Sequence, residues 1–150
     1  MRIGIVCYPT FGGSGVVATE LGIALAEEGH VVHFITYDRP VRLPHVHTNI
    51  FYHEVRVSDY PLFDYQPYEL VLTSKLVDVV KHERLDLLHV HYAIPHASAA
   101  WMAQRILEAQ GIRIHAEPGN FAQHLGLRHA DANGSVQVKA VLRGSAAEQA

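Results

Sequence analysis

Cysteine is almost absent from this chain: Cys7 is the only one among its 150 residues. A single cysteine excludes any disulfide within the chain, and with it the disulfide-stapled class of small secreted proteins; it is typical of a reducing compartment such as the cytoplasm. Cys7 follows the apolar residues Ile3, Ile5 and Val6. We therefore expect a buried strand residue. A reactive thiol would need a lowered pKa, which the nearby start of a helix leaves open as the alternative.

Long hydrophobic runs and clusters of basic residues are also missing. The apolar runs have the length of strands, well short of the roughly 20 residues of a transmembrane helix. Met1-Arg2-Ile3 leads directly into one of them, without the apolar core of a signal peptide. A net charge of −3 with no block of Lys or Arg argues against a nucleic-acid surface. With 49% hydrophobic and 18% charged residues, the chain has the composition of one globular domain with its own core.

What the chain does have is a regular alternation of short apolar runs and amphipathic segments. The pattern predicts strands at 2–8, 31–36, 50–57, 86–92 and 112–114, and helices at 16–28, 68–83 and 95–110. Such alternation predicts an α/β fold with a Rossmann-like parallel sheet. The first helix should end at Gly29. The residues expected to point inward are Val17, Leu21, Ala24 and Leu25 of the first helix and Leu72, Leu76, Val79 and Val80 of the second.

The most informative segment is Gly12-Gly13-Ser14-Gly15, which lies between the first predicted strand and the first predicted helix. The first amides of a helix have no intrahelical acceptor, the helix dipole adds partial positive charge, and glycine lets an anion approach the backbone. We therefore predict that Gly12, Gly13, Ser14 and Gly15 bind an anionic group of a substrate. The segment fits neither the dinucleotide nor the P-loop glycine pattern. A tight turn that binds nothing is the alternative.

A second candidate, Tyr92, follows the strand predicted at 86–92. In doubly wound sheets, ligands bind beyond the carboxyl ends of the strands. Pro9–Gly15, Tyr37–Pro40 and Tyr92–His96 all follow predicted strands. The glycine turn and Tyr92 should therefore share one crevice, where the Tyr92 phenol can donate a hydrogen bond to a ligand. A tyrosine that only packs at the edge of the sheet is the alternative.

Histidine is abundant, with 12 residues in the chain. His89 and His91 are two residues apart on one predicted strand, so both should point to the same side, with His96 nearby. A zinc site needs three or four converging ligands, and Cys7 is the one thiol available. We therefore expect hydrogen-bonded structural histidines and no metal. Ser14 does not lie in a G-x-S-x-G segment, which argues against acyl transfer.

A longer series of residues carries a family resemblance. It comprises Ile3–Pro9, the glycine turn, Val16–Gly22, Gly29-His30, Val32–Thr36, Asn49–Val55, Ser74-Lys75 and Leu88–Ala97. Over residues 1–114 the chain resembles the N-terminal half of retaining glycosyltransferases of family 4, which have the two-Rossmann (GT-B) architecture. It is most similar in these motifs to the members that transfer N-acetylglucosamine from UDP-N-acetylglucosamine to L-malate in bacillithiol biosynthesis.

That resemblance implies roles for the candidate residues. Gly13 and Ser14 correspond to contacts for a ligand anion, and Tyr92 corresponds to a contact for a malate carboxylate. The resembled enzymes use no metal in catalysis, and no other cofactor is expected. The resemblance leaves the catalytic residues unassigned, and it leaves open a homo-oligomer, another acceptor, or a non-catalytic Rossmann module that binds an anion or a nucleotide.

The resemblance ends after Ile114, where His115-Ala116-Glu117 replaces the Thr-Leu-His-Gly-Thr-Asp-like segment expected of the family. We therefore expect an acceptor-side domain over 1–114, followed by a weakly ordered tail over 115–150 that truncation or a frameshift would explain. Residues 137–140 could add an edge strand. Because no donor-binding domain is matched, we expect this chain alone to be inactive as a transferase.

Overall fold

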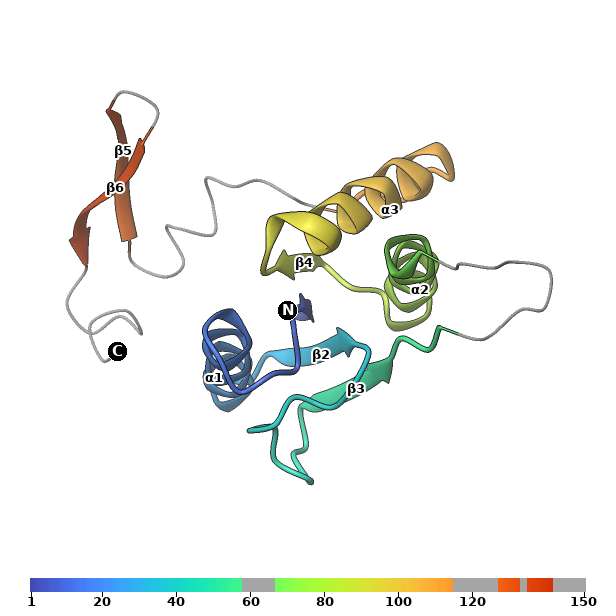
Figure 1. Cartoon of the computed structure of the whole chain (residues 1–150), viewed down its shortest axis with the longest axis horizontal. Coiled ribbons are helices and arrows are strands. Elements are labelled where there is room, and N and C mark those ends of the chain that lie inside the picture. Colours follow the sequence, from blue (N-terminus) through green and yellow to red (C-terminus); the bar gives the residue numbers. More distant parts are fainter. Residues whose placement is uncertain (58–66, 115–126, 133–134, 142–150) are drawn as a thin grey trace. The chain divides into compact units, whose positions relative to one another are not determined.

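The computed structural model of the chain describes residues 1–57, 67–114, 127–132 and 135–141 (Figure 1). The chain divides into two compact units, Met1–His115 and Ala116–Ala150. In both units together, no described helix combines the length and the hydropathy needed to cross a membrane.

The first unit is built on a sheet of four strands in the order β3-β2-β1-β4. The strands are β1 (Arg2–Val6), β2 (Val31–Thr36), β3 (Ile50–Glu54) and β4 (Leu87–Val90), and all neighbours are parallel. The predicted α/β fold with a Rossmann-like parallel sheet is confirmed. β1 and β2 are buried along almost their whole length, which explains why they are apolar at nearly every position.

Helices cover both faces of this sheet (Figure 1). α1 (Ser14–Glu27) packs on one face, where Ala18 and Ala26 join Ile5 and Phe34 in a buried cluster. α2 (Tyr68–Glu83) and α3 (Ser98–Ala109) pack on the other face, and the short π-helix η1 (Ala93–Ala97) leads from β4 into α3. The four residues predicted to face inward from α2 are buried as expected: Leu72, Leu76, Val79 and Val80.

The predicted inward face of α1 is wrong. Val17 is 60% exposed, and the buried residues of the helix are Gly15, Ala18, Thr19, Gly22 and Ala26. A β-carbon on Gly22 would fall against the Phe34 ring and 2.9 Å from Ile5 Cδ1. The helix therefore meets the sheet through its smallest side chains. The larger residue Leu25 lies partly buried beside that contact.

The strand predicted at 112–114 does not form. The Ile112 amide donates to the Leu107 carbonyl at 2.9 Å, and Gly111 has a φ of 78°, so these residues close the C-terminus of α3. Ile114 is nevertheless buried, only 6% exposed, in the cluster under α2 and α3. Ile114 is apolar because it packs in the core. The sequence alone could not distinguish such a buried segment without strand pairing from a buried strand.

The second unit holds a two-stranded antiparallel sheet, β5 (Leu127–Ala132) and β6 (Ser135–Val141). The strand suggested at 137–140 falls within β6, but its partner is β5 rather than the edge of the four-stranded sheet. Residues 115–126, 133–134 and 142–150 lie outside the described residues. The weak order of this tail stays a prediction.

Substitution of Gly22 tests whether stability depends on the close contact between α1 and the sheet. We expect Gly22→Ala to lower the free energy of unfolding by roughly 1–2 kcal/mol, because overpacking typically costs 1–3 kcal/mol and the higher helix propensity of alanine returns up to about 1 kcal/mol. Chemical denaturation measures the change. Gly12→Ala is the matched control, because a β-carbon there meets nothing within 4 Å. Equal stability of the two variants would contradict the packing argument.

Candidate functional site

The glycine turn joins β1 to α1 in a conformation that glycine alone adopts readily. Gly13 is the N-cap of α1, with φ 50° and ψ −118°. A β-carbon on Gly15 would fall on the Tyr8 carbonyl oxygen and 2.8 Å from that of Thr10. Two of the glycines are therefore explained by local geometry: Gly13 by its backbone angles and Gly15 by close approach.

The start of α1 carries backbone amides with long hydrogen bonds and the hydroxyl of Ser14. The amides of Gly15 and Val17 donate to the carbonyls of Gly12 and Gly13 over long distances of 3.3 Å. Ser14 is the first residue of the helix and is half-buried, and the first helical turn, which is described in full, carries no acidic side chain. No carboxylate of this turn would therefore repel an anion from the positive end of the helix; that an anion binds here stays a prediction.

Tyr92 follows β4 in a strained conformation. Its φ is 87° and its ψ 137°, in a region that side chains with a β-carbon rarely occupy. Its carbonyl accepts a hydrogen bond from the Ala97 amide at 3.1 Å, which holds this backbone in place. The side chain is 60% exposed, and its ring lies edge-on to the Tyr8 ring with centroids 5.2 Å apart.

Tyr8 connects the two candidate regions. Its backbone carbonyl contacts Gly15, and its ring contacts Tyr92. The glycine turn and Tyr92 thus both border Tyr8, just beyond the carboxyl ends of β1 and β4. That these residues bind a ligand stays a prediction.

An aromatic cluster lies at this edge of the sheet, and we call it the tyrosine cluster; of its members, the sequence predicted a binding role for Tyr92 alone. Tyr8 contacts the Tyr37 ring at a centroid distance of 6.5 Å, and Tyr37 contacts the Tyr68 ring at 5.8 Å. The members are Tyr8, Tyr37, Tyr68, Tyr92 and His96. They come from the ends of three strands, the start of α2 and η1. For Tyr37, the position just after a predicted strand was a signal; Tyr68, at the start of a predicted helix, had none.

His96 is the most buried member of the tyrosine cluster, with no exposed surface. Its Nδ1 lies 2.8 Å from the His91 carbonyl oxygen, which can only accept, so Nδ1 carries the proton. Burial lowers the His96 pKa, although that hydrogen bond opposes the shift. His96 Nε2 and the Tyr68 hydroxyl are buried with no hydrogen-bond partner among the described residues. Burial also raises the Tyr68 pKa, so its hydroxyl stays a donor at neutral pH.

Cys7 belongs to the core, whereas His89 of β4 and His91, just after β4, are partly buried. Cys7 has no exposed surface, and burial raises the pKa of its thiol to about 12, so it stays protonated and is not a nucleophile. His89 and His91 do point to the same side, with ring centroids 4.6 Å apart. Burial and the neighbouring His91 lower the pKa of His89 to about 4.

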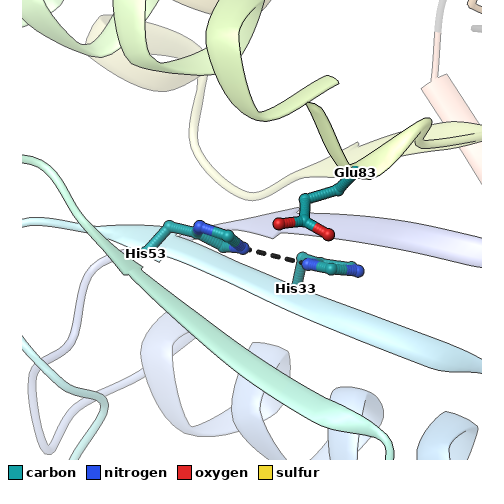
Figure 2. Close-up of side chains that lie close together, drawn as sticks. All are labelled: His33, His53 and Glu83. Carbon is teal, nitrogen blue, oxygen red and sulfur yellow. Dashed lines mark hydrogen bonds between the residues drawn. The ribbon is translucent and has the colours of Figure 1, made fainter. Parts of the chain in front are cut away.

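A different set of residues brings metal-ligating atoms together. His33 of β2, His53 of β3 and Glu83 of α2 each offer one such atom, and these atoms lie within 4.8 Å of one another (Figure 2). His33 Nδ1 and His53 Nε2 are 2.9 Å apart and share a hydrogen bond. The sequence analysis, which weighed only His89, His91, His96 and Cys7 for a metal, did not find this cluster, because its members are far apart in the chain.

Comparison with known proteins decides the family. The Glycosyltransferase Family 4 domain matches residues 11–116, well over half of the chain. The chain belongs to this family.

Two further comparisons concern individual members and structures. Over 107 residues, the family 4 chain is 56% identical to N-acetyl-alpha-D-glucosaminyl L-malate synthase of Bacillus anthracis. The match covers 71% of this chain but 28% of that relative, so the chain spans less than a third of the relative's length. The crystal structure of MurG from Acinetobacter baumannii aligns over 75% of this chain and 33% of that one, with a TM-score of 0.47 and 13% identity.

The lowered pKa of His89 predicts how the stability of the first unit depends on pH. The folded-state pKa of His89 is about 4, below the 6.5 expected of the unfolded chain. Between these values the unfolded state binds more protons, so stability is complete above pH 6.5 and is lost as the pH falls towards 4. We expect a loss on the order of 1–3 kcal/mol across this range.

Chemical denaturation at a series of pH values measures that loss. His89→Leu should make the curve less steep, because leucine beside Ile5 does not titrate, while the other histidines with lowered pKa values keep their share of the loss. His82→Gln, which removes an exposed histidine from α2, is the control and should leave the curve unchanged. An identical pH dependence in all three proteins would show that the stability loss does not come from His89.

Proposed function

We propose that the first unit supplies the acceptor-binding half of a retaining glycosyltransferase site that transfers N-acetylglucosamine from UDP-N-acetylglucosamine to L-malate. The observation that carries this proposal is the 56% identity to the Bacillus anthracis protein named N-acetyl-alpha-D-glucosaminyl L-malate synthase. The chemistry of the residues just beyond β1 and β4 supports it.

L-Malate has two carboxylates and one hydroxyl, and these residues offer donors for such a molecule. One carboxylate would lie over the start of α1, held by backbone amides of the first turn, the Ser14 hydroxyl and the positive end of the helix. The exposed phenol of Tyr92 would donate to the other carboxylate. Both charges would then be fixed, and the hydroxyl between them would face the donor sugar.

The role of this half is positioning. Holding an acceptor hydroxyl in line with the reacting carbon can supply about 7–11 kcal/mol of a barrier. Gly13 keeps the approach to the α1 amides open, and the strained backbone of Tyr92 sets the direction of its side chain. Tyr8, between them, fixes the spacing of these two contacts.

L-Malate binding to the chain tests the proposal. Isothermal titration calorimetry should detect saturable binding of L-malate, and Ser14→Ala and Tyr92→Phe should each weaken it about tenfold, since a hydrogen bond to a charged group contributes about 1.5–3 kcal/mol. Tyr37→Phe is the matched control: it removes a hydroxyl from the tyrosine cluster that the proposal does not use.

Two outcomes would contradict the proposal in different ways. Lactate, which keeps the hydroxyl but has a single carboxylate, bound as tightly as L-malate would indicate a family 4 protein with another acceptor. Binding of UDP-N-acetylglucosamine without any binding of L-malate would favour a nucleotide-binding module.

A further inference from the structure

The cluster of His33, His53 and Glu83 lies under α2, on the face of the sheet that carries Ile35. In the register of β2 and β3, His33 pairs with Phe51 and Ile35 pairs with His53. His33 and His53 are therefore diagonal neighbours on one face. Figure 2 shows their rings side by side with the Glu83 carboxylate, from the last turn of α2, turned towards them.

The atoms that converge here are of the kinds that bind transition metals: two imidazole nitrogens and one carboxylate oxygen, all within 4.8 Å of one another. Burial, together with His53, lowers the pKa of His33 to about 4, and burial lowers that of His53. Both rings are therefore neutral at pH 7. One hydrogen bond joins His33 Nδ1 and His53 Nε2, so one of these nitrogens carries a proton, which must move to the other nitrogen of its ring before a metal can bind both atoms. Neutral imidazole and carboxylate are ligands that Zn²⁺ takes.

We propose that His33, His53 and Glu83 bind a divalent transition-metal cation, Zn²⁺ above all, with water as the fourth ligand. Zinc–nitrogen bonds of 2.0–2.1 Å in a tetrahedron place two nitrogens roughly 3.3 Å apart. The 2.9 Å between His33 Nδ1 and His53 Nε2 thus needs to widen by only a few tenths of an ångström. Glu83, with its flexible side chain, closes the remaining distance, since all three ligand atoms already lie within 4.8 Å.

An ion has a route to this site. A cavity of about 500 Å³ lies between β3 and α2, and its lining includes His53, Lys75 and Asp78. His33 closes the inner side of the site, because it has no exposed surface. The site is therefore open to solvent on the side of His53 and closed by the sheet on the side of His33, as a bound water ligand requires.

Arg2 competes with the metal for Glu83. Its Nη2 lies 3.2 Å from Glu83 Oε2, and the two side chains are 44% and 35% exposed. The ion would replace part of this exposed pair and join α2 to β2 and β3. This role is structural, and it does not depend on the proposed transfer to malate.

Titration of the metal-free chain with Zn²⁺, followed by calorimetry, tests the site. We expect one tight binding event per chain, separate from weak binding to exposed histidines. His53→Gln and Glu83→Gln should each weaken this event at least about tenfold. His82→Gln and Glu27→Gln are the controls, because they remove an exposed histidine and an exposed carboxylate and should change nothing.

Arg2→Gln should change the affinity for Zn²⁺ in the opposite direction from the ligand variants. It frees Glu83 from its ion pair, so Zn²⁺ should bind several-fold more tightly if Glu83 is a ligand. Substitution with Co²⁺ should add the visible absorption bands of a tetrahedral site to the wild-type chain, and Glu83→Gln should weaken them.

The wild-type chain provides a readout that needs no variant. In ¹H–¹⁵N spectra of the imidazole rings, the first equivalent of Zn²⁺ should shift the signals of His33 and His53. A first equivalent that shifts other histidines, or a tight event retained in both His53→Gln and Glu83→Gln, would overturn the proposal. So would the absence of any event of one ion per chain.

Discussion

The structure of the first unit depends on the hydrogen bonding of β1 along both of its edges. Ile3 pairs with Val32 of β2 on one side and with Leu87 of β4 on the other. From β1 the chain enters α1 on one face, and from β4 it enters η1 and α3 on the other face. In doubly wound sheets, ligands bind where the connections from two neighbouring strands run to opposite faces of the sheet. The order of β1 and β4 places the glycine turn and Tyr92 at such a point.

Small residues decide how closely α1 can follow β1 and β2. Gly15 lies against the Tyr8 carbonyl, and Gly22 lies against the Phe34 ring. The same contact that seals this side of the core therefore fixes the start of α1 beside Tyr8, where its amides can face a ligand. A larger residue at either position would move the helix and, with it, the polar groups of the turn. Packing and the candidate site are thus linked through one helix.

The sequence predicted the positions of helices and strands better than it predicted which of their residues make contacts. Strands and helices of the first unit were found from periodicity, since a buried parallel strand and an amphipathic helix leave different patterns. The ends were less accurate: the first strand was expected to reach Tyr8, but pairing with β2 and β4 stops at Val6. The inward face of α1 was wrong because the pattern was judged by large apolar residues, whereas the real contact uses glycine and alanine. The Ile112–Ile114 segment is buried without forming a strand, a difference that only the use of its amides reveals.

The two candidate sites differ in how they can be found. The glycine turn is contiguous in the chain, so its chemistry can be predicted before the fold is known, and Tyr92 follows from the rule that ligands bind beyond strand ends. Tyr37 and Tyr68 join the tyrosine cluster only through strand order. The cluster of His33, His53 and Glu83 depends in addition on register, since a shift of one residue between β2 and β3 would turn His53 to the α1 face of the sheet. A polar cluster that depends on strand register leaves no local motif in the sequence. It is found by asking which polar side chains share one face of the sheet and which partner or ligand could bind their polar atoms.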